Sequence, residues 1–235
     1  MTATAETGAR DLLADAKQRF AGDVARHVMM PYRDNGLYRH LAFRRFAPPA
    51  EGQPPRVSSF YWFDLITWPG SLVINGDCGT FVFSRTEDML GFFRGHRINP
   101  DYWAEKVRGE TRTRRYSSER FRQFVTEAAQ EAEEDWPGLS EAAERDIFGK
   151  FSAWNTEFEE GAHEAVRDFE YRTPGLAASA EGFRFDHAWE WNLRDWDWQF
   201  LWCLHAIQWG ISQYDLSKGA VPVAAALSGE EARAS

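Results

Sequence analysis

Two carboxylate–imidazole pairs have a spacing that could bind a metal. Glu160 and His163 are three residues apart on a predicted helix, so their side chains share one face. This pair is half of the pattern found in carboxylate-bridged di-iron proteins, which needs a second such pair and further inward glutamates. The other pair, His187 and Glu190, has the opposite order. We therefore predict no metal site and no cofactor, because solvated helix faces form such pairs by chance.

Nucleophilic catalysis would require a thiol or hydroxyl group beside a base. Cys203 lies in an apolar helical segment and is expected to be a small buried hydrophobic residue. Cys78 lies in a glycine-rich turn and is expected to be more exposed. The sequence GDCG around it lacks the length of a phosphate-binding loop. We predict no catalytic residues; if the chain is an enzyme, His187 or Glu190 would be its acid–base group.

Charged residues are segregated into two consecutive blocks. Residues 106–122 carry seven basic and two acidic side chains, whereas residues 127–146 carry eight acidic side chains and one arginine. The first block could bind phosphate, and the second could attract a basic partner. The candidate binding residues are Arg112, Arg114 and Arg115 in the first block and Glu131, Glu133 and Glu134 in the second. The alternative is that the blocks neutralise each other or form solvated faces.

Six of the eleven tryptophans lie between Phe183 and Tyr214. From about Leu193 the pattern is helical and apolar on more than one face, which is typical of a buried helix. We predict that this helix places Trp196, Phe200 and Leu204 in the core. A second stripe could form a binding face, because tryptophan is enriched in interface hot spots. Its members are Trp198, Trp202, His205 and Trp209.

Alternating and β-branched segments predict a sheet in the first half of the chain. Its expected strands cover residues 38–46, 57–67, 71–74 and 80–84. Short turns join the last three, which indicates an antiparallel meander of about four strands. An amphipathic helix is expected over residues 11–28, ended by Pro31. The proline-rich residues 47–56 are expected to form an exposed loop.

After Arg85 the pattern changes to that of helices. Three helices are expected over residues 86–95, 100–108 and 117–135. Three more follow: one begins at Ser140, one after a capping box formed by Thr156 and Glu159, and the last at Leu193. Strands followed by helices predict the α+β class, with a helical C-terminal half packed on the sheet. We expect one domain over residues 1–216, with strands at about 38–84 and helices at about 86–214, and a flexible tail over residues 217–235.

Bulk composition limits the cellular context. The chain is 43% hydrophobic and 27% charged, as in ordinary globular proteins, and its formal net charge is −9. That charge disfavours general binding to nucleic acid or anionic membranes. The two cysteines form no disulfide framework, and no segment has the signature of a secretory signal or a membrane span. We therefore expect a cytoplasmic location without membrane association.

Two segments carry a resemblance. Residues 60–93, FYWFDLITWPGSLVINGDCGTFVFSRTEDMLGFF, resemble uncharacterised proteins of bacteriophages and prophages. Residues 185–215 are similar to the C-terminal part of the same group, in matching order and spacing. The group has no activity that could assign catalytic residues here. The resemblance implies a small phage accessory protein in the cytoplasm of a bacterial host, and such proteins often interfere with host machinery or defence.

Three hypotheses of function follow. The first is a phage protein that binds and inhibits a host protein or complex, such as an immune nuclease. The second is an enzyme acting on a nucleotide or nucleic acid, with the arginines of the basic block holding phosphate. The third is a protein that sequesters a nucleotide or another phosphate-bearing ligand. We favour the first, because the sequence is rich in aromatic residues and has segregated charge but contains no recognisable catalytic motif. The partner and the oligomeric state are not specified by the sequence.

Overall fold

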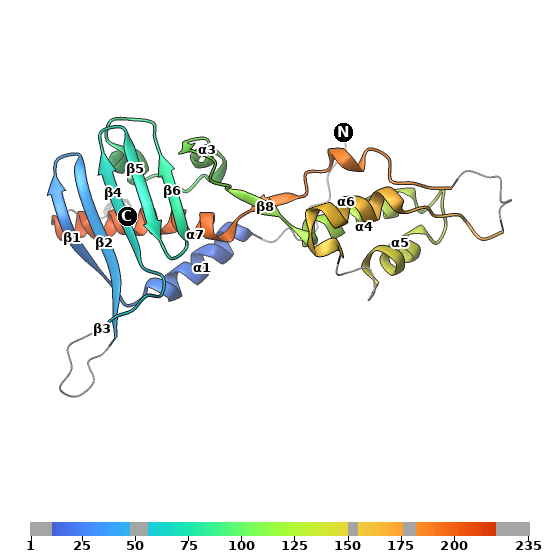
Figure 1. Cartoon of the computed structure of the whole chain (residues 1–235), viewed down its shortest axis with the longest axis horizontal. Coiled ribbons are helices and arrows are strands. Elements are labelled where there is room, and N and C mark those ends of the chain that lie inside the picture. Colours follow the sequence, from blue (N-terminus) through green and yellow to red (C-terminus); the bar gives the residue numbers. More distant parts are fainter. Residues whose placement is uncertain (1–10, 48–55, 150–154, 176–181, 220–235) are drawn as a thin grey trace, which may run out of the picture. The chain divides into compact units, whose positions relative to one another are not determined.

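The computed structural model describes residues 11–47, 56–149, 155–175 and 182–219. The chain divides into two units (Figure 1): unit 1 comprises Met1–Thr113 and Trp196–Ser235, and unit 2 comprises Arg114–Asp195. Unit 2 is therefore an insertion in the sequence of unit 1. Each unit has its own hydrophobic core. Whether the two units fold together as the one predicted domain over residues 1–216 stays a prediction.

Unit 1 contains a seven-stranded antiparallel sheet, in which six strands follow the order β1-β2-β4-β5-β6-β7 and β3 pairs with β2. The strands are β1 (His27–Asn35), β2 (Tyr38–Ala47), β3 (Arg56–Val57), β4 (Phe63–Trp68), β5 (Ser71–Gly76), β6 (Gly79–Phe83) and β7 (Val107–Arg108). The consecutive neighbours β4, β5 and β6 form the predicted meander, and the α+β class is confirmed.

The sheet differs from the prediction at two strands: β1 was missed, and β4 begins later than expected. β1 was not expected, because Pro31 suggested only the end of a helix; the preceding helix α1 in fact covers Leu12–Val24. Proline is compatible with an edge strand, and the pairing of β1 shifts register between Pro31 and Arg33. The second expected strand is also shorter, since residues 58–62 form no strand. Tyr61 has a positive φ of 55° there.

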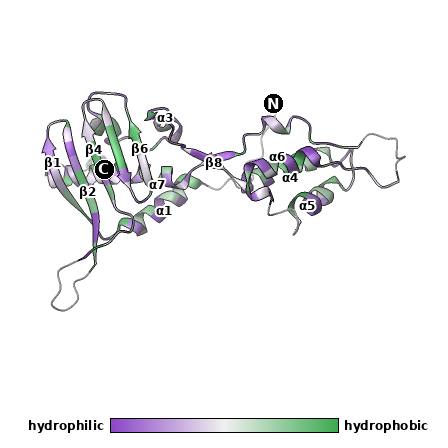
Figure 2. Cartoon of the chain, in the orientation of Figure 1, coloured by the Kyte–Doolittle hydropathy of each residue, from purple (hydrophilic) through white to green (hydrophobic). Residues whose placement is uncertain are grey.

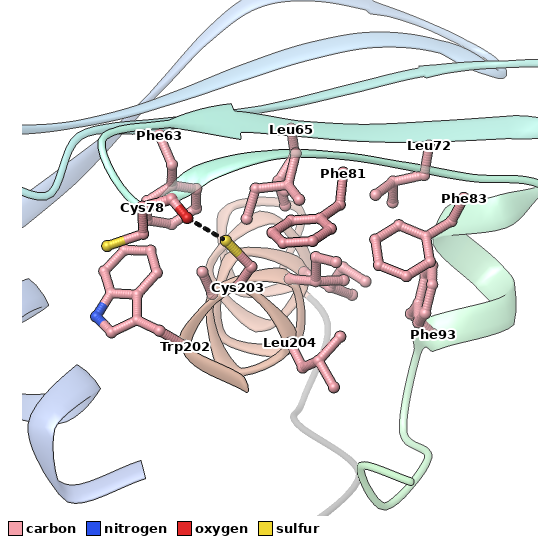
Figure 3. Close-up of a cluster of buried hydrophobic side chains, with 14 of the residues drawn as sticks. Phe63, Leu65, Leu72, Cys78, Phe81, Phe83, Phe93, Trp202, Cys203 and Leu204 are labelled. Carbon is pink, nitrogen blue, oxygen red and sulfur yellow. Dashed lines mark hydrogen bonds between the residues drawn. The ribbon is translucent and has the colours of Figure 1, made fainter. Parts of the chain in front are cut away.

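The inner face of the sheet packs on the tryptophan-rich helix α7 (Trp198–Ser217). Figure 3 shows strand side chains pointing at this helix, whose buried residues include Phe200, Trp202 and Leu204. The inner-face residues, all 3% exposed or less, are Leu41, Phe43, Phe63, Leu65, Leu72, Ile74, Phe81 and Phe83. Gly210 allows this close approach, because a Cβ there would lie 2.7 Å from a methyl group of Leu65.

The start of α7 differs from the prediction. Leu193 and Trp196 precede the helix, and the strand β9 (Arg194–Trp196) takes the place of the predicted first turn. Asp197 caps the helix, because its carboxylate accepts a hydrogen bond from the backbone N–H of Gln199 at 2.9 Å. Trp196 is half-buried rather than a core residue. The prediction of a buried helix is confirmed for the part that follows.

Helix α1 packs along α7, where its Phe20 contacts Trp202 and Trp209, two rings that also contact Phe63 of the sheet. The short helices α2 (Met89–Phe93) and α3 (Pro100–Ala104) complete the unit. Helix α2 begins later than the predicted residue 86, because Asp88 caps it through the N–H groups of Leu90 and Gly91. The predicted helix through Arg108 ends earlier, where β7 begins.

Unit 2 is helical. Its elements are β8 (Arg114–Tyr116), α4 (Ser118–Ala132), α5 (Leu139–Phe148), η1 (Asn155–Glu157), α6 (Glu159–Asp168) and η2 (Ala188–Glu190), and β8 pairs with β9. Figure 2 shows mixed hydrophobic and hydrophilic residues along α4 and α5, as expected of helices with one buried face. Ser117, at the predicted start of this helix, caps α4, since its hydroxyl accepts a hydrogen bond from the N–H of Arg120 at 3.1 Å.

The predicted capping box of α6 is wrong. Phe158 is the N-cap residue and makes no side-chain capping bond, while Thr156 is buried in the preceding turn. Other predictions lie largely or wholly outside the described residues, among them the loop over residues 47–56 and the tail from residue 217. Helix α7 itself reaches Ser217. Among the described helices, none combines the length and apolarity that crossing a membrane would need.

The connection between the units is short. The backbone N–H of Asp197 donates to the carbonyl oxygen of Thr113 at 3.0 Å, both within unit 1. Within unit 2, the N–H of Ser117 donates to the carbonyl oxygen of Leu193 at 2.9 Å. The chain therefore leaves unit 1 and re-enters it at neighbouring points.

Candidate functional site

A groove of about 620 Å³ lies between α1 and the beginning of α7 in unit 1. We call it the tryptophan groove; its residues are Leu12, Asp15, Ala16, Gln18, Arg19, Trp196, Trp198, Leu201 and Trp202. Capping fixes one wall, because Asp11 accepts hydrogen bonds from the N–H groups of Leu13 and Ala14 and so starts α1. The volume is in the range of sites that take a small ligand or a side-chain anchor.

The two α7 tryptophans of the groove have different roles. Trp202 is 1% exposed, its indole N–H donates to Asp23 at 3.0 Å, and its ring meets Phe20 edge-on at 5.1 Å. It is therefore part of the core wall. Trp198 is 42% exposed and lies one turn earlier. Of the three predicted tryptophans, Trp198 is the most exposed.

Arg19 organises the polar side of the groove. Its guanidinium lies 3.9 Å from the ring centre of Trp198, a cation–π contact that holds the ring in place. The same group donates to the Tyr61 hydroxyl at 3.3 Å and pairs with Asp23 at 3.9 Å. The hydrogen bond from Arg19 to Tyr61 is the main cause that raises the pKa of Arg19. The groove thus combines a fixed cation with an aromatic surface.

The groups in this groove suit recognition of another molecule. Its lining supplies aromatic and aliphatic surface, the cation of Arg19 and the carboxylate of Asp15. Tryptophan and arginine are the residue types that dominate protein–protein hot spots, since they offer large contact area with directional polar groups. A preformed ring at the edge of a groove can receive an apolar or aromatic side chain with little further ordering.

Trp209 and His205 line a second groove, of about 640 Å³, beside α1 and α7. Trp209 is half-buried, with ring centres of Phe20 and Phe43 at 6.0 and 5.5 Å. His205 donates from Nε2 to the carbonyl oxygen of Leu13 at 3.2 Å, and burial lowers its pKa. This stripe of α7 is therefore largely covered by α1, and His205 is a hydrogen-bonded histidine of that contact.

The arginines of the predicted phosphate patch are divided between the two units. Arg112 is exposed in unit 1, whereas Arg114 and Arg115 belong to β8 of unit 2. Neighbouring residues on a strand point to opposite faces, so Arg114, half-buried, and Arg115, exposed, do not point the same way. Phosphate binding by these arginines stays a prediction.

The predicted acidic patch loses one member to a structural role. Glu131 and Glu134 are exposed, as expected. Glu133 is half-buried, and its carboxylate accepts hydrogen bonds from the N–H groups of Gly138 and Ser140, both at 2.7 Å. These bonds cap the start of α5. The Ser140 side chain and, after it, the two backbone N–H groups lower the pKa of Glu133. Glu133 therefore has a structural role in unit 2, and its part in binding a partner stays a prediction.

The metal and catalytic candidates stand alone in the structure. Within the described residues, no group of three or more histidine, cysteine, aspartate or glutamate side chains could hold a metal ion. His187 Nδ1 and a carboxylate oxygen of Glu190 are 3.9 Å apart, and both side chains are about 70% exposed. Glu160 is exposed and His163 half-buried on α6. In the part of the chain that the structure describes, no further histidine, cysteine, aspartate or glutamate completes a metal site at either pair.

Both cysteines are buried, so the prediction of a more exposed Cys78 is wrong. Cys78 is 3% exposed, and burial raises the pKa of its thiol to about 12. The Cys203 thiol donates to the carbonyl oxygen of Cys78 at 3.6 Å (Figure 3). Burial also raises the pKa of Cys203, which confirms its role as a core residue. Thiols that stay protonated in a core are poor nucleophiles.

Sequence patterns did not reveal Arg19, Asp23 or Tyr61 as parts of a site. Arg19 and Asp23 are four residues apart on α1, a spacing that indicates only a surface ion pair. Their contacts with Tyr61 and with α7 are long-range. Comparison of the chain with protein-family models, with curated proteins and with solved structures finds no match.

Proposed function

We propose that this chain is a phage accessory protein that binds a host protein and inhibits it, and that its target is a component of a bacterial defence complex such as an immune nuclease. The host cytoplasm is then its place of action. The support from the structure is one observation: Trp198 is 42% exposed at the edge of the tryptophan groove and is held against Arg19 at 3.9 Å. The phage assignment itself rests on the sequence resemblance.

The arrangement suits an inhibitor that occupies a surface. Trp198 begins a long helix whose other side lies in the core, so the ring has a rigid base. A rigid anchor loses little conformational entropy on binding, and a central tryptophan commonly contributes a large share of an interface. Arg19 can at the same time pair with a carboxylate of the target, because its position is set by Tyr61 and Asp23.

A pull-down with paired variants tests the proposal. Wild-type protein and Trp198→Ala serve as bait in lysate of a bacterial host, with Trp189→Ala as the matched control, since Trp189 is 71% exposed but belongs to unit 2. We expect wild type and Trp189→Ala to capture one host protein that Trp198→Ala loses. The affinity for the identified protein should fall about thirtyfold or more, as for a hot-spot residue.

Two results would reject the proposal. One is a captured set that is the same for wild type and Trp198→Ala when both variants give the same circular dichroism spectrum. The other is turnover of a nucleotide by the purified protein that His187→Ala abolishes. The second result would establish the enzyme alternative in which His187 acts as the acid–base group.

A further inference from the structure

The outer face of the sheet, the side opposite α7, presents a patterned surface. Alternation along the strands places the inner-face residues towards α7 and the residues between them outward. Several large outward side chains are exposed: Val28 by 53%, Tyr32 by 61%, Tyr38 by 49% and Trp68 by 39%. Exposed apolar side chains that gather on one face mark an interaction surface more often than scattered ones do.

One row of this face crosses six strands in register. Pairing places Arg33 opposite His40, His40 opposite Ile66, and the row then continues through the next three strands. The complete row is Arg33, His40, Ile66, Val73, Val82 and Arg108. With strands about 4.8 Å apart, it is about 24 Å long. It has three aliphatic residues at its centre and an arginine at each end.

Charge on the outer face is opposite to that of the whole chain, whose formal net charge is −9. Among the described strands, Asp64 is the single acidic residue that faces outward, and it is paired with Arg44 at 2.7 Å and with His40 at 3.1 Å. Within the described part of the chain, neither Arg33 nor Arg108 has a carboxylate partner. Both ends of the row therefore offer a cation to a partner.

We propose that the outer face binds an amphipathic helix of a partner protein, with apolar residues on Ile66, Val73 and Val82 and acidic residues near Arg33 and Arg108. A helix that spans 24 Å needs about 16 residues at 1.5 Å each. Apolar residues on successive turns cover about 10 Å, which matches the distance across the three aliphatic strand positions. This surface is distinct from the tryptophan groove and goes beyond the function proposed for it.

A protein helix fits this row better than a single-stranded nucleic acid. Nucleic-acid platforms place aromatic rings where bases stack and cations along the whole path of the backbone. Here the centre is aliphatic, and the cations lie at the two ends. The same sheet already accepts a helix across its strands on the inner face, where α7 runs behind β4, β5 and β6 (Figure 1).

Binding of synthetic probes to the full chain tests the inference. The probes are a fluorescein-labelled helical peptide of about 16 residues with a leucine stripe and glutamates at both ends, its counterpart with lysines in place of the glutamates, and a thymidine oligonucleotide. Fluorescence anisotropy is measured with wild type, with the double variant Arg33→Glu/Arg108→Glu, and with Arg97→Glu as control. Arg97 is exposed and lies outside the strands.

We expect the acidic peptide to bind wild type and Arg97→Glu equally, and the basic peptide to bind at least about tenfold more weakly. The double variant should reverse this preference. Equal binding of both peptides, no binding of the acidic peptide, or preferential binding of the oligonucleotide would overturn the inference. None of these probes is expected to contact Trp198. A negative result here would therefore reject the helix-binding inference without bearing on the function tested by the pull-down.

Discussion

Replacement of Phe200 by alanine should remove one of the central contacts between α7 and the sheet. Phe200 is fully buried, and its ring centre lies 5.1 Å from that of Phe81, 6.5 Å from that of Phe83 and 5.6 Å from that of Trp196. Truncation of a buried phenylalanine costs about 3–5 kcal/mol. Because the sheet and the rest of α7 are rigid, the cavity left by the lost ring cannot collapse. We therefore expect the free energy of unfolding to fall by about 4 kcal/mol, a large part of the stability of a typical domain.

Urea unfolding followed by circular dichroism and tryptophan fluorescence measures this loss. With an m-value of about 2 kcal/mol/M, the transition of unit 1 should shift by about 2 M. Trp198→Ala is the control on the same helix and should shift it by less than about 0.5 M, because that ring is already 42% exposed. A shift below about 0.5 M for Phe200→Ala would show that the helix is not a core element and would refute the reasoning.

Three further predictions concern particular contacts. Glu133→Gln should lower the melting temperature, because its carboxylate caps α5, whereas Glu134→Gln, at an exposed position, should leave it unchanged; equal melting curves would contradict this role. Burial lowers the pKa of His205 below 6.5, so the stability that its neutral form contributes is present above pH 6.5 and is lost as the pH falls below it; His205→Gln should flatten that slope in unfolding measured from pH 7.5 to 5. Replacement of residues 114–195 by a short glycine–serine linker should leave unit 1 folded, since its two ends share a hydrogen bond, and loss of the β-sheet signal would support a single cooperative domain instead.

Local patterns were sufficient for the fold class and for most of the meander. Turn residues and alternation placed β2, β5 and β6 to within two residues, because the information lies within each strand and its turns. β1 was missed for a physical reason: Pro31 ends a helix and is also tolerated in an edge strand, and the sequence does not say which applies. The pairing with β2 decides the matter.

The beginning of α7 shows how tertiary pairing overrides a helical pattern. Leu193 and Trp196 have the spacing of one helical face, yet this segment belongs to β9 and pairs with β8, more than 70 residues away in sequence. The N-cap at Asp197 then starts the helix. The local sequence does not show that these residues form hydrogen bonds with a distant strand instead of continuing the helix. The predicted start of α7 is therefore five residues too early.

The candidate site was predictable in its residue types but not in its geometry. A helix that is apolar nearly all round must be covered on both sides, and the sequence leaves open whether a partner or the chain itself provides the second cover. α1 provides it here over Trp202 and His205, and leaves Trp198 exposed. The tryptophan stripe therefore indicated the correct helix. The exposed fraction of each ring depends on how much of α7 is covered by α1, which the stripe does not show.

The outer row of the sheet depends even more on long-range structure. Its six residues are distributed over 76 positions of the chain, from Arg33 to Arg108, and none of them is distinctive in its own segment. Side chains on a strand alternate, so a register shift of one residue on β5 would turn Val73 inward and bring Leu72 or Ile74 to the outer face. The two arginines become the ends of one surface because the successive strand pairings, including the register shift next to Arg33, place all six residues in one row. A binding surface of this kind is a property of the assembled sheet, which is why the charge blocks along the sequence did not single out Arg33 or Arg108.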